Sequence, residues 1–253
     1  MKYKWVETTY HLLHAYEELA LEYRRKREPS EAFSPEITSG PLAERPSMNH
    51  GNYGYIFALL NLNAAVIEGT MRSLLSEIVS EDVKQRTDEG FARGQTRRTP
   101  QENLLIKFYV DLDSSGGWDK LKEHYSVYRD VSIDKSLTTD TRDAISTLFL
   151  LRNIFAHGTA FIHPNDKVPD DLRDEPVFKW QSRVQRATVY LEKHFGHKDV
   201  FDNLGEYHLA KHFFDNTKTF FEEILPVINF PSKRIEKTVS LLKRASWGYR
   251  NFP

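Results

Sequence analysis

Three residues near the middle of the chain have side chains suited to phosphate chemistry: Arg152, Asn153 and His157. A guanidinium binds a phosphate through parallel hydrogen bonds, and an imidazole exchanges protons near neutral pH. Asn153 and His157 are four residues apart, so a helix would place them on one face. This spacing predicts a site that holds a phosphate and moves a proton.

A simpler interpretation of the same residues is structural. Arg152 falls within an apolar stripe, where a guanidinium needs a partner because its burial alone is costly. It would then pair with a structural carboxylate or reach solvent, and His157 would only occupy a helix end.

The element that must position these residues is a helix predicted over residues 138–158. Thr138, Thr139 and Asp140 are typical of a helix start, and Gly158 is typical of the position after a helix end. Between them, apolar residues recur at spacings of three and four, which predicts one buried face; they are Ala144, Ile145, Leu148, Phe149, Leu151 and Phe155.

A second helix, predicted over residues 53–79, carries Glu68 within its apolar face. Two opposite charges inside the apolar faces of two helices favour a mutual contact, because each alone would be costly to bury. We therefore expect Glu68 to support Arg152 structurally. The alternative is that Glu68 is exposed and that this face is oriented differently.

The Arg-Asn-x-x-x-His pattern of residues 152–157, at the end of a capped helix, resembles the motif of HEPN domains. The Ala64-x-x-x-Glu68-x-x-x-Arg72 pattern resembles an early helix of the same helical-bundle family, which comprises ribonucleases and RNA-binding modules. The resemblance is clearest over residues 53–158. It implies a metal-independent endoribonuclease acting in defence, as a toxin or in RNA processing.

In that chemistry a ribose 2′-hydroxyl attacks the adjacent phosphate and leaves a 2′,3′-cyclic phosphate and a 5′-hydroxyl. The resemblance assigns His157 as acid or base, Arg152 to the phosphorane oxygens, and Asn153 to orientation of the phosphate or the histidine. It also implies an RNA substrate, a homodimer with the site at its interface, and, in some members, an antitoxin protein as partner. Thr159 stands where many toxins of one subgroup have a modified tyrosine, which argues against regulation by that modification.

Two other functions fit the same sequence. One is a non-catalytic HEPN-like helical module that binds RNA or a partner protein. The other is a structural interaction protein in which Arg152 and Glu68 form a buried pair.

Composition narrows the function classes further. The formal net charge of −1 gives no overall attraction to nucleic acid, so such binding would need local basic patches. The absence of cysteine excludes thiol catalysis and thiolate zinc sites. His208 and His212 have the spacing of a metal pair, but structural histidines explain them more simply, and we expect no metal or cofactor. No apolar run has the length of a membrane span, so we expect a soluble, cytoplasmic protein.

These patterns predict an all-α fold: an up-and-down helical bundle with additional peripheral helices. We expect one domain over residues 1–253, with a HEPN-like core over about 53–160 and a C-terminal helical extension over about 177–253. Residues 177–195 are compatible with a helix or a strand, and we favour a helix because no strand partner is evident. Residues 81–98 are interpreted as a connection or short helix, whose arginines either contact phosphates or are simply solvated.

Overall fold

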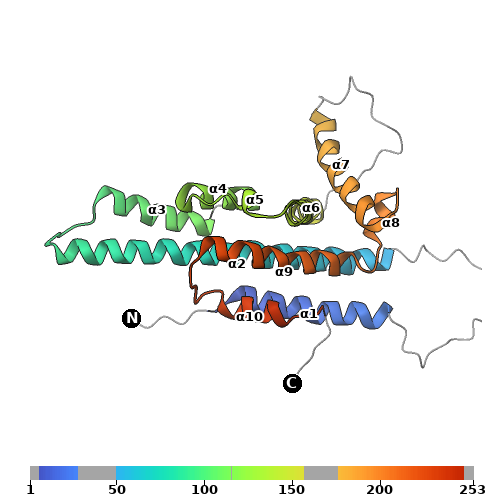
Figure 1. The fold of residues 1–253 in the computed structure, drawn as a ribbon, viewed down its shortest axis with the longest axis horizontal. Helices are drawn as coiled ribbons and strands as arrows, with labels where there is room; N and C mark the ends of the chain where they lie inside the picture. The colour runs from blue at the N-terminus through green and yellow to red at the C-terminus, as the bar shows by residue number, and fades with distance from the viewer. Residues whose placement is uncertain (1–5, 28–49, 115, 157–175, 248–253) are drawn as a thin grey trace, which may run out of the picture. The chain divides into compact units, whose positions relative to one another are not determined.

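The computed structural model describes residues 6–27, 50–114, 116–156 and 176–247, and these ranges form ten helices and no strand (Figure 1). The predicted all-α fold class is confirmed. The helices are α1 (Thr8–Arg27), α2 (His50–Ala92), α3 (Pro100–Ser114), α4 (Trp118–Arg129), α5 (Ile133–Ser136), α6 (Thr139–Ala156), α7 (Pro176–Phe195), α8 (Val200–Leu204), α9 (Leu209–Ile228) and α10 (Glu236–Arg244).

The chain forms two compact units, each assembled from separate stretches of sequence. Unit 1 comprises residues 1–13, 65–138 and 220–244, and unit 2 comprises residues 14–64, 139–219 and 245–253. Residues of the predicted core and of the predicted C-terminal extension occur in both units. The expectation of a single domain stays a prediction.

The core of unit 1 gathers around the part of α2 that follows Ala64. Its helices are joined by hydrogen bonds between distant residues: the hydroxyl of Tyr125 donates to the carbonyl oxygen of Met71 at 2.7 Å, and that of Tyr128 donates to Asp82 at 2.6 Å. The last segment of the chain is joined in the same way. The buried carboxylate of Glu77 accepts hydrogen bonds from the backbone N–H of Arg234 at 3.1 Å and of Lys233 at 3.3 Å.

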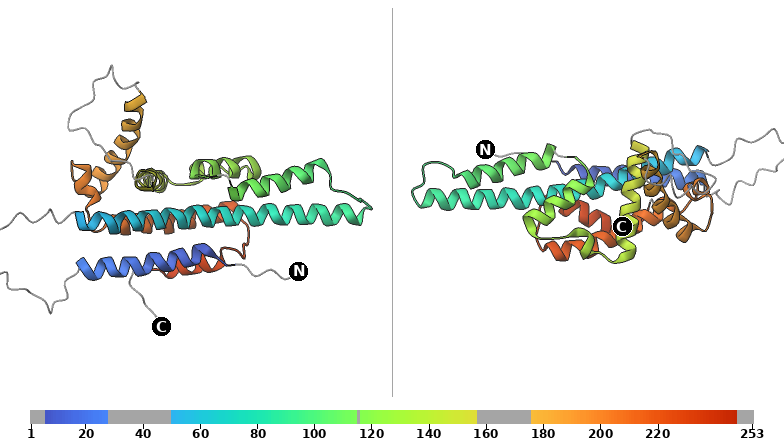
Figure 2. Two further views of the ribbon diagram at one scale, coloured as in Figure 1. Left: turned by 180° about the vertical axis from the view of Figure 1, so that it is seen from behind. Right: turned by 90° about the horizontal axis from the view of Figure 1, so that it is seen from above.

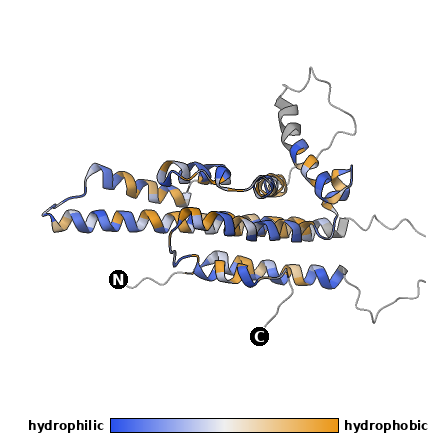
Figure 3. Cartoon of the chain, in the orientation of Figure 1, coloured by the Kyte–Doolittle hydropathy of each residue, from blue (hydrophilic) through white to orange (hydrophobic). Residues whose placement is uncertain are grey.

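Unit 2 contains the helix that carries the predicted motif. Tyr16 of α1 is buried, stacks on Phe214 of α9 with ring centroids 4.7 Å apart, and donates to the carbonyl oxygen of Ala210. The inner face of α6 is buried as its periodicity predicts at Ala144, Ile145, Leu148, Phe149 and Leu151. At its end the prediction differs from the structure, because Ile154 is buried and Phe155 is half-buried. The helices carry both hydrophilic and hydrophobic residues, as one-sided burial requires (Figure 3).

Helix α2 extends to Ala92, thirteen residues beyond the predicted end at residue 79. Its last turns are mostly exposed and are stabilised by polar pairs four residues apart, such as Gln85 with Glu89 and Arg93 with Glu89. Gly94, with φ of 84°, follows the helix end in a left-handed conformation that suits glycine. Helix α3 then runs beside this part of α2 (Figures 1 and 2).

Candidate functional site

The last turns of α6 bring together two of the predicted site residues. Nη1 of Arg152 donates a hydrogen bond to Oδ1 of the neighbouring Asn153 at 2.9 Å. Arg152 is half-buried, with its guanidinium 6.0 Å from the ring centre of Phe149 one turn earlier, whereas Asn153 is exposed. The arginine therefore snorkels: its stem lies along the apolar face while its charged end meets a polar neighbour.

This turn of α6 is held against α2 by an aromatic contact. The rings of Phe155 and Phe57 stack with centroids 3.7 Å apart and an interplanar angle of 15°. Ile154 beside them is buried, with 1% of its surface exposed. Because both contacts lie within three residues of Arg152, they hold in place the helix turn that carries it.

The remaining predicted site residues have different outcomes. Helix α6 ends at Ala156, so His157 and the predicted cap Gly158 lie outside the described residues. Glu68 is largely buried, with 13% of its side chain exposed, and it forms an ion pair with Arg72 at 2.9 Å. The alternative of an exposed Glu68 is therefore wrong. A contact between Glu68 and Arg152 would join the two units, and it stays a prediction.

A groove of about 680 Å³ lies between α6 and α7, beside the motif. Its lining includes three cations; it comprises Arg142, Asp143, Ser146 and Thr147 of α6 and Gln185, Arg186, Val189, Tyr190 and Lys193 of α7. Ser146 and Asn153 are both exposed and are seven residues apart, which places them on the same side of α6 about 10 Å apart along the axis. The groove and Asn153 thus share one face of the helix.

The charges of the groove are partly balanced within it. Nζ of Lys193 lies 3.4 Å from Asp140, and Nε of Arg142 lies 3.6 Å from Asp143, with all four side chains well exposed. Exposed pairs of this kind contribute little to stability and are easily exchanged for another anion. Arg186 forms no ion pair within the described ranges.

Tyr190, one of the residues that line the groove, contacts the ring of a half-buried histidine, that of His212. The hydroxyl of Tyr190 and Nε2 of His212 are 2.7 Å apart, and the ring of His194 lies 4.7 Å from that of His212. Burial, followed by the nearby charges of Asp140 and Asp143, raises the pKa of Tyr190, so its hydroxyl stays protonated. Burial, followed by His194, lowers the pKa of His212 to about 4, so this imidazole is neutral at pH 7.

The sequence did not reveal this groove. Arg142, Arg186 and Lys193 are ordinary polar residues of two separate helices, and only the packing of α7 on α6 brings them together. His208 is exposed and His212 is half-buried, as expected of structural histidines. Among the described residues, no three side chains of His, Cys, Asp or Glu gather closely enough to hold a metal ion.

Comparisons with protein-family models, with curated proteins and with solved structures found no match to this chain. The resemblance to HEPN domains therefore depends on the motif residues alone. None of the helices in the described ranges combines the length and hydropathy that crossing a membrane requires.

Proposed function

We propose that this protein is an endoribonuclease of the HEPN type, which cleaves RNA by attack of a ribose 2′-hydroxyl on the adjacent phosphate. The observation that carries the proposal is the arrangement at the end of α6, where Arg152 is hydrogen-bonded to the exposed Asn153 four residues before the position of His157. A guanidinium matches the geometry of a phosphate through parallel hydrogen bonds, which a lysine cannot copy.

The reaction needs one group to accept a proton and one to donate a proton. The imidazole of His157 takes the proton of the 2′-hydroxyl, the 2′-oxygen bonds to phosphorus, and the bond from phosphorus to the 5′-oxygen breaks. A second acid protonates that 5′-oxygen; in a two-fold dimer, His157 of the other copy is available for this role. Arg152 stabilises the negative charge that develops on the phosphorane oxygens.

The groove between α6 and α7 supports an RNA substrate. Arg142, Arg186 and Lys193 offer positive charge to the phosphates of nucleotides that flank the one being cut. Ser146 and Gln185 supply uncharged groups that hydrogen-bond sugars or bases.

The test is cleavage of a mixed single-stranded RNA by wild type, by His157→Ala and by His11→Ala. His11 is an exposed histidine of α1, outside the motif, and serves as the matched control. His157→Ala should cleave about 10²-fold more slowly or worse, the usual scale for a lost acid or base. His11→Ala should equal wild type. The products should carry cyclic phosphate ends, and activity should persist in EDTA, because nucleophile and proton carriers belong to RNA and protein.

Equal cleavage by wild type and His157→Ala would overturn the proposal. Binding of RNA by wild type with no cleavage, unchanged by His157→Ala, would instead support the non-catalytic RNA-binding module. Both variants should be compared at matched thermal stability, so that a loss of rate reports chemistry rather than unfolding.

A further inference from the structure

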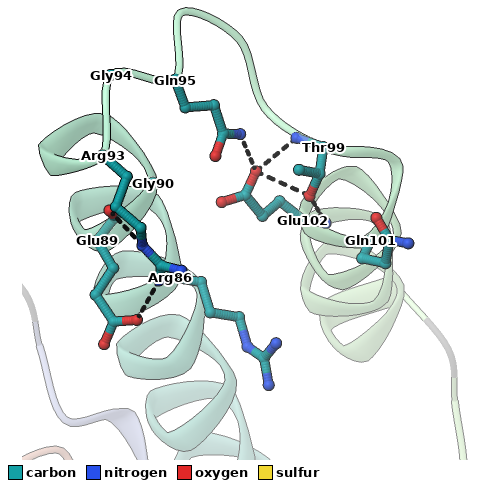
Figure 4. Close-up of a pocket in the computed structure, with 9 residues that line it drawn as sticks. All are labelled: Arg86, Glu89, Gly90, Arg93, Gly94, Gln95, Thr99, Gln101 and Glu102. Carbon is teal, nitrogen blue, oxygen red and sulfur yellow. Dashed lines mark hydrogen bonds and ion pairs between the residues drawn. The ribbon is translucent and has the colours of Figure 1, made fainter.

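The turn that joins α2 to α3 in unit 1 encloses a second polar pocket, of about 480 Å³ (Figure 4). It is lined by Arg86, Glu89, Gly90, Arg93, Gly94, Gln95, Thr99, Gln101 and Glu102. Residues 90–101 contain three arginines and no acidic residue, so this turn is locally basic in a chain of net charge −1.

Both carboxylates of the pocket are already engaged. Glu102 is buried and accepts hydrogen bonds from the backbone N–H of Thr99 at 2.6 Å, from the Thr99 hydroxyl at 3.0 Å and from Gln95 at 3.1 Å. The hydroxyl of Thr99 in turn accepts from the backbone N–H of Glu102, which completes a capping box at the start of α3. Glu89 forms an ion pair with Arg93 at 3.1 Å.

Three other arginines have exposed side chains near this turn. Arg86 extends from α2 into the space between α2 and α3 (Figure 4), and Arg97 and Arg98 lie on the turn itself. All three are exposed and form no ion pair within the part of the chain that the structure describes. Exposed cations gathered on one turn are a feature with which proteins follow the phosphodiester backbone of single-stranded nucleic acid.

We propose that Arg86, Arg97 and Arg98 form a binding surface for the phosphodiester backbone of single-stranded RNA. This surface is called the α2–α3 surface below. The three arginines contact phosphates. The capping box and Gly94 give the turn a defined shape, so little ordering is needed when RNA binds. The choice of RNA as the bound polyanion rests on the proposed function. The basic surface is observed independently of that function.

The test is the salt dependence of RNA binding. Fluorescence anisotropy would be measured with the full chain and a labelled 2′-O-methyl RNA longer than the roughly 16 nucleotides of a typical single-strand site. This RNA lacks the attacking hydroxyl and stays intact. The variant is Arg86→Gln with Arg97→Gln and Arg98→Gln. The control is Arg25→Gln with Lys135→Gln and Lys198→Gln, which removes the same charge from exposed positions elsewhere.

For single strands each phosphate contact contributes about 0.7 to the slope of log affinity against log salt, so the triple variant should lower that slope by about 2. The control should keep the wild-type slope. Circular dichroism and thermal melting should be the same for all variants, since every substituted side chain is exposed.

An unchanged slope in the triple variant, an equal change in the control, or no RNA binding by wild type would overturn the α2–α3 surface. Cleavage of ordinary RNA is scored separately with the same proteins. RNA binding that follows the predicted slopes without any cleavage would keep the surface and refute the ribonuclease. Cleavage of RNA together with an unchanged salt slope in the triple variant would support the ribonuclease and refute the α2–α3 surface.

Discussion

At the scale of single residues, Arg152 shows how an apparent conflict in the sequence is resolved. Its position in an apolar stripe left two alternatives: a structural carboxylate as partner, or a side chain that reaches solvent. The structure places it half-buried along Phe149 and hydrogen-bonds it to Asn153. A sequence pattern at 100° per residue gives the direction of Cα–Cβ and not the path of a long side chain, so the pattern could not decide between the two alternatives.

The neutral imidazole of His212 predicts a dependence of stability on pH. Burial, followed by His194, lowers its pKa to about 4, against about 6.5 for an unfolded chain; Lys211 lowers it and Asp215 raises it, while the Tyr190 hydroxyl faces the ring. As pH falls, the unfolded state therefore binds a proton at His212 before the folded state does. Stability contributed by this residue is present above pH 6.5 and is lost as pH falls toward 4.

Wild type should lose on the order of 2 kcal/mol through His212 between pH 7 and pH 4. His212→Gln keeps a hydrogen-bonding group for Tyr190 but does not titrate, so its unfolding free energy should fall less over this range. Urea denaturation at several pH values gives both curves. Parallel curves would mean that His212 is charged in the folded protein or titrates normally.

At the scale of elements, the sequence predicted that a helix forms better than it predicted where the helix ends. The periodicity of residues 138–158 predicted α6, and residues 177–195, for which a helix was favoured over a strand, form α7. The extension of α2 to Ala92 was missed because its last turns have no apolar stripe and are stabilised by local polar pairs and by α3. The groove beside α6 was missed because it depends on how α7 packs.

The stacked rings of Phe57 and Phe155 should position the motif as well as stabilise unit 2. Phe155→Ala removes the contact and should cost about 2 kcal/mol, less than a fully buried phenylalanine because Phe155 is half-buried. Phe155→Leu keeps most of the volume and should cost less. Denaturation measures both. RNA cleavage well below either melting temperature should fall more for alanine than for leucine; equal rates would mean that the stack does not position Arg152.

Glu77 should hold the segment before α10 in unit 1. Its carboxylate accepts from the backbone N–H groups of Lys233 and Arg234 and from the hydroxyl of Ser232. Glu77→Ala leaves these donors without their acceptor and should cost about 2 kcal/mol. Glu81→Ala, an exposed position one turn later on the same helix, should change stability by less than about 0.5 kcal/mol. A similar, small effect of both substitutions in urea denaturation would refute the role of Glu77.

At the scale of the whole molecule, near-neutral charge hides an uneven distribution. Acidic and basic residues nearly balance over the chain, yet three cations line the groove of unit 2 and three exposed arginines form the α2–α3 surface of unit 1. A chain of this kind gains no long-range attraction for RNA and must bind through local contacts. We therefore expect its RNA affinity to fall with salt in proportion to a few phosphate contacts and not many.

The proposed chemistry predicts a specific oligomeric state. Phosphoryl transfer to the 2′-oxygen needs a base and an acid at one phosphate, and the motif offers one histidine per chain. We therefore predict a two-fold homodimer in which both His157 residues serve one site. Sedimentation at tens of micromolar should show a dimer, and the cleavage rate per chain should fall on dilution as the dimer dissociates.

Mixing wild-type and His157→Ala subunits distinguishes a shared active site from dimerisation alone. A large excess of His157→Ala added to wild type should trap each active chain in a dimer with one histidine. If one site needs both histidines, cleavage should drop well below that of the same wild type mixed with an equal excess of serum albumin. If each chain carries a complete site, the wild-type chains keep their activity in mixed dimers and the two mixtures cleave equally. That second result would refute the shared site while leaving His157 as a catalytic residue of each chain, because the loss in His157→Ala alone would be unchanged.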